Sequence, residues 1–403
     1  MNVLGIITEY NPMHNGHIYH IEEAKKITKA DYVICVMSGS FTQQGNISVI
    51  NKFKRAEIAI QNGIDLVIEL PTVYATSSSE DFAKGAVNIL NSLGIVTHIA
   101  FGSECKDINL LENIASKIVE NEEYIHSQTS QNMQQGISAP TARDLVYKEI
   151  LTDEEYLETS KPNNILGIEY ITSLLRLKSK IKPVCIPRLN SCHSDIKTDN
   201  SSVFASSTAI RNELELNKNY LENIQNFVPF STLEMLKNSN IKLNENFFLL
   251  LKYKILILGK ERLRNIREVT EGLENRIISC IKDCNTYEDF IQKLKCKRYT
   301  LGRIKRICIN ILLGITKDLD YTDLYYARIL KISNKSINLL SLLENSSIDI
   351  ITSLNENKLN KLDKSILELL NLDILATNIR EIDGNINLDY TNNIIYINEN
   401  AGK

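Results

Sequence analysis

The sequence predicts an α/β protein in which a parallel sheet covered by helices is followed by a mainly helical C-terminal region. Up to about Arg211, short apolar runs alternate with helical stretches, a pattern typical of a parallel sheet with helices on both faces. Beyond that point apolar residues recur mostly at helical spacing. With 403 residues, of which 43% are hydrophobic, the chain can form two to three domains. We expect regions at 1–216, 217–315 and 316–403.

Five apolar runs are the expected strands of the first region. They lie at residues 3–7, 31–37, 65–71, 98–101 and 183–187. Apolar residues at helical spacing indicate helices between them, with the first through Ile18, Ile21, Ala24 and Ile27. Ligands of parallel sheets bind beyond the carboxyl ends of the strands, so the segments that follow these runs are the candidate site.

The first of these segments, between the first strand and the first helix, is the most informative. Asn11-Pro12 ends the strand and His14-Asn15-Gly16-His17 opens the helix. The first turn of a helix has unpaired N–H groups and a positive dipole end, which favour a phosphate. Gly16 lets a base or phosphate approach the backbone between His14 and His17. A single histidine near a turn is usually a surface or capping residue, but two around a glycine here indicate phosphate chemistry.

Two later patches belong to the same region. Residues 161–170 predict a loop entering a helix, with an asparagine that either caps the helix or contacts a ligand. Ser206 to Arg211 places hydroxyls at a helix start and a guanidinium one turn in. Such hydroxyls alone are commonly an N-cap. Beside a nucleotide site, Ser207, Thr208 and Arg211 would hold the β and γ phosphates of a leaving group.

Composition narrows the class of protein. No run of about 18 apolar residues occurs, and the first residues enter a strand without a basic and apolar leader, so we expect a cytoplasmic protein without a membrane segment. The eight cysteines are scattered and lack CxxC pairing, which favours reduced thiols and no metal site.

Charge is unevenly placed along the chain, whose formal net charge is −3. Between Lys252 and Arg306 there are 15 Lys plus Arg against 7 Asp plus Glu. A charge run is often a solvated helix face, but this one surrounds Tyr299, and basic residues around an aromatic favour contact with RNA phosphates. The candidate RNA-binding residues are Lys297, Arg298, Arg303 and Arg306.

The last region, from Thr316, is rich in Asn, Leu, Ile and Ser. Leucines at 339, 340, 342 and 343 predict a helix, and residues 387–398, with apolar residues at 394–397, predict a short strand or an ordered tail. We assign this region no task from its sequence.

Together these stretches resemble the bacterial tRNA(Met) cytidine acetate ligase family, within the His-x-Gly-His nucleotidylyltransferase superfamily. Two positions depart from the family pattern. Met13 stands where an aromatic is usual and keeps a large apolar side chain, whereas Gln44 stands where an arginine is usual, so no role of that arginine is carried over. The resemblance is carried by residues 5–20, 37–45, 54–57, 65–71, 79–83, 101–104, 162–170, 204–211, 271–276 and 297–300.

The resemblance implies a Rossmann-like nucleotidylyltransferase domain at 1–216 that binds ATP and acetate, and a tRNA-binding helical region at 217–315. It implies a ligase that activates acetate with ATP, without coenzyme A, and acetylates N4 of the wobble cytidine of elongator tRNA(Met). Mg²⁺ would accompany the triphosphate. His14 and His17 are the expected catalytic residues. The residues implied for ATP binding are Ile7, Thr8, Glu9, Tyr10, Asn11, Pro12, Met13, His14, Asn15, Gly16, His17, Ile18, Tyr19, His20, Gly102, Asn163 and Arg188.

Two other functions remain open from the sequence. One is a nucleotidylyltransferase acting on a small phosphorylated metabolite, against which the large basic helical region counts. The other is a non-catalytic RNA-binding protein of the same fold, against which the intact His14, His17 and Ser206–Arg211 patches count.

Overall fold

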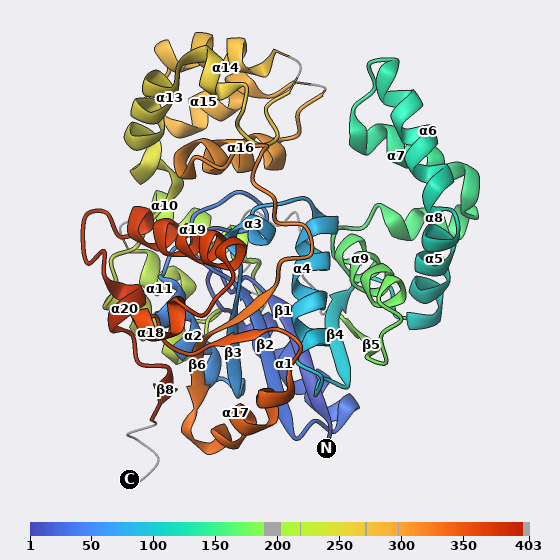
Figure 1. The fold of residues 1–403 in the computed structure, drawn as a ribbon, viewed down its shortest axis with the longest axis vertical. Coiled ribbons are helices and arrows are strands. Elements are labelled where there is room, and N and C mark those ends of the chain that lie inside the picture. Colours follow the sequence, from blue (N-terminus) through green and yellow to red (C-terminus); the bar gives the residue numbers. More distant parts are fainter. Residues whose placement is uncertain (189–202, 218, 271, 297, 398–403) are drawn as a thin grey trace.

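Eight strands form one sheet in the order β5-β4-β1-β2-β3-β6-β7, with β8 paired to β6 (Figure 1). The computed structural model describes residues 1–188, 203–217, 219–270, 272–296 and 298–397. The strands are β1 (Val3–Thr8), β2 (Tyr32–Ser38), β3 (Leu66–Leu70), β4 (His98–Ser103), β5 (Lys182–Pro187), β6 (Tyr326–Ser333), β7 (Asp349–Ile351) and β8 (Ile395–Tyr396).

Strands β1 to β5 are parallel and agree with the five predicted runs. They are apolar throughout because both faces of the sheet are covered: along β2, Val33 and Cys35 enter one core while Ile34 and Val36 enter the other. The chain adds β2 and β3 on one side of β1, and β4 and β5 on the other. The strand order therefore reverses at β1, which places the expected ligand crevice beyond its carboxyl end.

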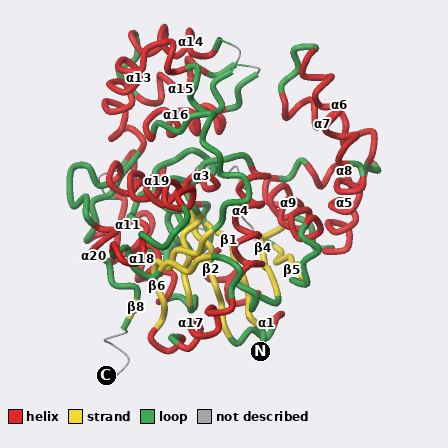
Figure 2. Tube along the Cα trace, in the orientation of Figure 1, coloured by secondary structure: helices red, strands yellow, loops and turns green. Residues whose placement is uncertain are grey.

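Helices cover the two faces of this sheet (Figure 2). Helix α1 packs on one face through Ile21 and Ala24, and α2 packs there through Phe53 and Ala56. Helices α4, α5 and α9 share the core on the opposite face. The bounds in this part are α1 (Asn15–Thr28), α2 (Lys52–Gln61), α3 (Thr72–Ala75), α4 (Ser79–Ser92), α5 (Ile108–Glu120) and α9 (Pro162–Arg176).

A helical hairpin projects from the β5 side of the sheet, at the right of Figure 1. It consists of α6 (Glu122–Gln134) and α7 (Ala139–Ile150), followed by α8 (Asp153–Thr159). Helix α6 has no buried residue, so the hairpin adds little to the core. Its turn reaches toward the basic region, since a Cβ at Gly136 would lie 3.0 Å from the Arg298 guanidinium.

Residues 217–315 are helical, as the apolar spacing predicts. Helices α13 to α16 enclose a core of their own, separate from the cores of the sheet and built around residues such as Ile277, Phe290 and Ile307. The bounds are α10 (Ser207–Leu216), α11 (Tyr220–Ile224), α12 (Phe230–Lys237), α13 (Phe248–Leu263), α14 (Leu273–Lys282), α15 (Tyr287–Leu294) and α16 (Leu301–Leu313).

The chain from residue 316 onward returns to the sheet. Strand β6 pairs antiparallel with β3, so the last region extends the sheet of the first. The predicted helix and short strand correspond to α17 and β8, whereas β6 was not predicted. The helices here are α17 (Asn338–Leu342), α18 (Glu356–Leu359), α19 (Lys364–Arg380) and α20 (Leu388–Thr391).

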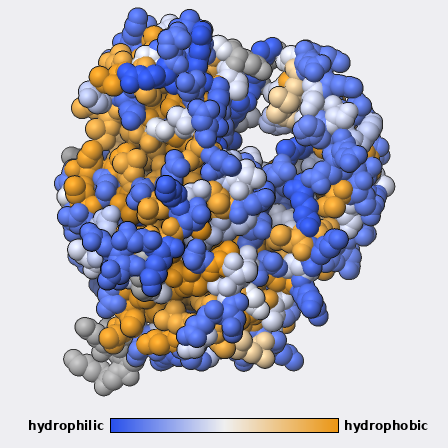
Figure 3. Space-filling view, in the orientation of Figure 1, coloured by the Kyte–Doolittle hydropathy of each residue, from blue (hydrophilic) through white to orange (hydrophobic). Residues whose placement is uncertain are grey.

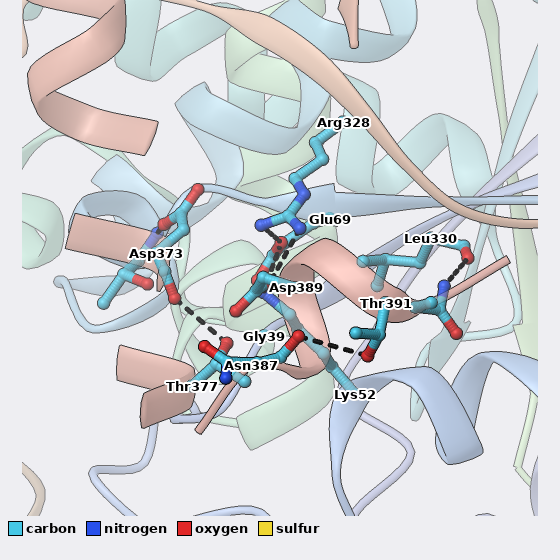
Figure 4. A network of polar contacts seen from close by, with 12 residues as sticks. Gly39, Lys52, Glu69, Arg328, Leu330, Asp373, Thr377, Asn387, Asp389 and Thr391 are labelled. Carbon is cyan, nitrogen blue, oxygen red and sulfur yellow. Dashed lines mark hydrogen bonds and ion pairs between the residues drawn. The ribbon is translucent and has the colours of Figure 1, made fainter. Parts of the chain in front are cut away.

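A buried ionic cluster joins this last region to the sheet (Figure 4). Lys52 Nζ lies 2.8 Å from Glu69 Oε1 and 2.9 Å from Asp389 Oδ1. Arg328 completes the cluster at 3.4 Å from Glu69 and 2.6 Å from Asp389. All four side chains are at most 5% exposed, so removal of one partner would leave an opposite charge buried without compensation.

Candidate active site

A cavity of about 270 Å³ lies beyond the carboxyl end of β1, where the strand order reverses. Its wall is formed by the segment after β1, the first turns of α1 and α10, and the ends of β4 and β5. This is the position expected for a ligand in a parallel sheet of this topology.

Two stacked imidazoles form the centre of the wall. The ring centroids of His14 and His17 lie 3.7 Å apart with the planes 26° from parallel. His14 is the N-cap of α1 and accepts a hydrogen bond at Nδ1 from the Gly16 N–H, 3.1 Å away. His17 Nδ1 accepts from the His14 N–H at 3.2 Å. The helix start therefore holds both rings in one orientation.

These two hydrogen bonds fix the tautomer of each ring. Because Nδ1 is the acceptor in both, a neutral imidazole at either position carries its proton on Nε2. Burial is the main cause that lowers the pKa of His17 well below its usual value, and the charges of His14, His20 and Arg188 lower it further. His17 is thus a neutral N–H donor at physiological pH, suited to an anionic oxygen.

The end of the cavity near β5 contains Asn163, Arg188 and Gly102. Arg188 follows β5 and donates from Nη1 to Asn163 Oδ1 at 3.0 Å. The Asn163 side-chain amide donates to Glu104, so Asn163 positions Arg188 instead of capping α9. A guanidinium at this end supplies positive charge to a phosphate or a polar edge to a base.

The start of α10 forms another part of the cavity wall. Ser206, not Ser207, caps this helix, accepting from the Ala209 N–H at 3.0 Å. Arg211 donates to the Asn11 carbonyl at 2.7 Å and to Thr208 Oγ1 at 3.1 Å, so its guanidinium fixes the segment after β1. Ser207 Oγ lies 3.5 Å from the Pro12 carbonyl oxygen.

The opposite end of the cavity, toward β2, is formed by Glu9 together with the loop after β2. Glu9 Oε1 accepts a hydrogen bond from the Gln43 N–H at 2.7 Å. Burial raises the pKa of the Glu9 carboxyl, against the lowering effects of the Gln43 N–H and of the Arg211 and Arg55 charges. Gln43 and Gln44 of that loop line the cavity beside Glu9, and Phe82 of α4, Phe101 of β4, and Leu166 and Tyr170 of α9 line it as well.

Most residues implied for ATP binding line this cavity, but four do not. Met13 is buried in the core under α1. The Asn15 amide donates to the Val203 and Asn226 carbonyls, away from the cavity. Pro12 and Ile18 are also absent from its lining. The implied residues that do line it are Ile7, Thr8, Glu9, Tyr10, Asn11, His14, Gly16, His17, Tyr19, His20, Gly102, Asn163, Arg188, Ser207, Thr208 and Arg211.

The candidate tRNA-binding residues lie apart from the cavity, at the start of α16 and in the loop before it. Lys297 falls outside the described residues. Arg298 is exposed, whereas Arg303 and Arg306 lie 3.8 and 3.4 Å from the Glu268 carboxylate. Arg303 also lies over the Tyr299 ring, 4.8 Å from its centroid. Arg298 is thus the most exposed of the three described candidates.

Two classes of feature are absent from the described part of the chain. No group of three or more His, Cys, Asp and Glu side chains gathers there as a metal site. None of its helices combines the length and apolar character needed to cross a bilayer.

Fold and site together define a HIGH nucleotidyl transferase, and the family model of that description matches residues 1–392. The predicted fold class is confirmed. The tRNA(Met) cytidine acetate ligases of Clostridium kluyveri and Clostridium perfringens (strain SM101) are 39% and 40% identical over 394 residues, covering 94% of this chain and 94% of theirs. The chain belongs to the tRNA(Met) cytidine acetate ligase family.

Solved structures agree with this assignment. The crystal structure of apo Thermotoga maritima TmcAL has a TM-score of 0.91 at 33% identity, covering 98% of this chain and 100% of that one. The same protein bound with alpha-thio ATP has a TM-score of 0.86 at 34% identity, covering 95% and 94%.

Proposed function

We propose that this protein is an ATP-dependent ligase that forms acetyl-adenylate and transfers the acetyl group to N4 of the wobble cytidine of elongator tRNA(Met). The observation that carries the proposal is the stacked His14 and His17 pair at the start of α1, in the wall of the cavity beyond β1, in a chain of this family. A tRNA substrate places the reaction in the cytoplasm.

In the first step an oxygen of acetate attacks the α-phosphorus of ATP, and the bond from that phosphorus to the β-phosphate oxygen breaks. Negative charge accumulates on the oxygens around phosphorus, and pyrophosphate leaves. No covalent bond to the protein forms, so positioning and fixed donors account for catalysis. The Nε2–H groups of His14 and His17 would stabilise this charge, and Arg188 and the α10 start would hold the remaining phosphates.

In the second step the cytosine amine attacks the acetyl carbonyl and AMP leaves. The lone pair of N4 is delocalised into the ring, so the amine is a weak nucleophile. The mixed anhydride compensates because its phosphate is a good leaving group. Acetate is thereby activated directly, and coenzyme A has no part in the proposal.

Mg²⁺ would bind to this protein together with ATP, coordinated by the triphosphate. The described residues provide no metal cage, and Mg²⁺ commonly binds through substrate phosphates with only one or two carboxylates. The ion would neutralise the β and γ phosphates, and the protein groups named above act on the α-phosphate.

Nucleoside mass analysis tests the proposal. The protein would be incubated with ATP, isotopically labelled acetate and total tRNA, and the tRNA would then be digested. We expect labelled N4-acetylcytidine in elongator tRNA(Met), and acetate-dependent exchange of labelled pyrophosphate into ATP. Exchange without labelled cytidine would indicate another acceptor. Absence of both in folded protein would exclude the ligase activity.

A further inference from the structure

Two polar side chains in the cavity wall, Glu9 and Tyr170, have no role in the two steps proposed above. Glu9 Oε1 accepts a hydrogen bond from the Gln43 N–H at 2.7 Å, and the Gln44 N–H also acts on the carboxyl and lowers its pKa, so the loop after β2 holds the carboxylate in the cavity wall. Tyr170 is only 4% exposed and lines the same cavity, and its hydroxyl makes no hydrogen bond to a described residue. A hydroxyl in a cavity wall without a protein partner is available to a ligand.

The chemistry of these two side chains suits a pyrimidine with an exocyclic amine. A carboxylate accepts from an amine N–H, as acidic side chains do from cytosine N4. A tyrosine hydroxyl can donate to ring N3 or O2. Phe82 and Phe101 supply apolar faces of the kind that hold an unstacked base.

The Glu9 end of the cavity lies against the basic helical region. Gly45, one residue after Gln44, packs so closely on α16 that a Cβ there would lie 2.4 Å from the Lys305 Cβ. Lys305 Nζ donates to Asn46 Oδ1 at 3.2 Å. Figure 3 shows the surface hollowed between this region and the α6–α7 hairpin. RNA bound along α16 would therefore reach the Glu9 end before the Arg188 end.

We infer that the Glu9 end is the subsite for the flipped-out cytosine of the acceptor RNA, in which Glu9 accepts an N4–H and then takes its proton. This inference rests on the proposed function. The N4 lone pair forms a bond to the acetyl carbonyl carbon, the bond from that carbon to the AMP oxygen breaks with its electrons, and the N4 proton passes to Glu9 Oε2. The products are N4-acetylcytosine, AMP and a protonated Glu9, which releases its proton to solvent.

Burial and charge agree with this role. The raised pKa of the Glu9 carboxyl makes its anion a stronger base than an exposed carboxylate. Burial is the main cause that raises the pKa of the Tyr170 hydroxyl, and the charge of Glu9 raises it further. The tyrosine therefore stays protonated and able to donate.

The test supplies synthetic acetyl-adenylate to the enzyme and measures a single turnover of transfer to tRNA, which bypasses ATP. We expect Glu9→Gln to slow transfer by about 100-fold or more, the range for a general base, and to abolish the rise of rate with pH. Glu9→Asp keeps a carboxylate and should restore part of the rate with its pH dependence. Tyr170→Phe should raise the KM for tRNA about tenfold and change kcat little.

The outcomes separate the inference from the proposed function. If wild-type enzyme transfers acetyl from the adenylate and Glu9→Gln does so equally fast, Glu9 serves ATP or its Mg²⁺ and the inference is wrong. An unchanged KM in Tyr170→Phe would remove the tyrosine from the subsite. If the wild-type enzyme itself transfers nothing, the proposed function fails instead.

Discussion

At the scale of single residues, the imidazole pair shows how a helix cap can fix the orientation of two side chains. The backbone N–H bonds to Nδ1 at His14 and His17 direct the Nε2 protons away from the helix start. Removing either ring should lower acetate-dependent pyrophosphate exchange by about 100- to 1,000-fold, as for other preorganised donors. Exchange kinetics of His14→Ala and His17→Ala would measure this. The control is His126→Ala, on the exposed α6, which should leave the rate unchanged.

His20 predicts a pH dependence of stability. Burial, as the main cause, lowers its pKa from 6.5 to about 4. Between these values the unfolded chain binds a proton that the folded chain does not, so the free energy of unfolding falls as pH falls below about 6.5. At about 1.4 kcal/mol per pKa unit, the loss should reach about 3 kcal/mol near pH 4. Urea unfolding at pH 7 and pH 4.5 measures it.

The matched variant is His20→Phe, which cannot bind the proton. Its stability should fall less than that of the wild type over the same interval. Equal slopes in the two proteins would show that other groups cause the acid dependence.

At the scale of elements, Arg55 of α2 holds the ends of two strands together. It is 1% exposed and donates to the carbonyls of Glu9, just beyond β1, and of Ser38 and Gly39, at the end of β2. Beyond these residues the strands separate and the cavity begins, so the guanidinium replaces the ladder hydrogen bonds that end there. Burial is the main cause that lowers its pKa.

Replacing Arg55 by Met should therefore lower the free energy of unfolding by about 3 kcal/mol or more, because several buried carbonyls lose a charged donor. Arg55→Lys should recover little, since one ammonium cannot span both strand ends. Denaturant unfolding measures both variants. Lys26→Met is the control, because the Lys26 side chain is 75% exposed and should change stability by no more than about 0.5 kcal/mol.

The elements also show what the sequence could and could not predict. Strands β1 to β5 were predicted because they are apolar throughout. Strand β6 was not, because Arg328 and Lys331 interrupt its apolar run, and their burial depends on distant partners: Glu69 and Asp389 for the first, Glu57 for the second. A charged residue in a sequence is normally expected at the surface. It is buried only where the fold places a side chain of opposite charge beside it.

The residues of the candidate site likewise divide into those that the sequence predicted and those that it did not. His14 and His17 were predicted because their geometry is local, fixed by one turn of helix. Tyr170 and Phe82 were not singled out as ligands, because only the packing of α9 and α4 on the sheet brings them to the cavity. Asn163 was predicted at the site, but its hydrogen bond to Arg188 depends on the pairing of β4 with β5.

At the scale of the whole molecule, the last region and the sheet depend on each other. Asp389 of α20 lies within ion-pair distance of both Lys52 and Arg328, with its side chain fully buried. Asp389→Ala should lower the free energy of unfolding by about 3 to 5 kcal/mol, the range for breaking a buried pair. Denaturant unfolding compares it with Asp318→Ala, an exposed position that should change little. Similar values for the two variants would contradict the role of the cluster.

The basic region and the cavity are separate parts that one RNA must join. Reversing charge at Arg298 should weaken tRNA binding about tenfold and reduce the slope of log affinity against log salt by about 1, because one phosphate contact is lost. Arg298 is chosen because it is exposed, whereas Arg303→Glu would also remove the contacts of a half-buried arginine to Glu268 and Tyr299. Filter binding over a range of salt concentrations measures both quantities.

Lys26→Glu is the matched control, since it makes the same charge change on α1, at the far end of the molecule from α16 (Figure 1). Pyrophosphate exchange without tRNA reports whether the nucleotide site is intact in each variant. If Arg298→Glu and Lys26→Glu weaken tRNA equally, the effect is one of net charge, and the tRNA does not lie along α16. A loss confined to Arg298→Glu would place the RNA on the basic region at the start of α16.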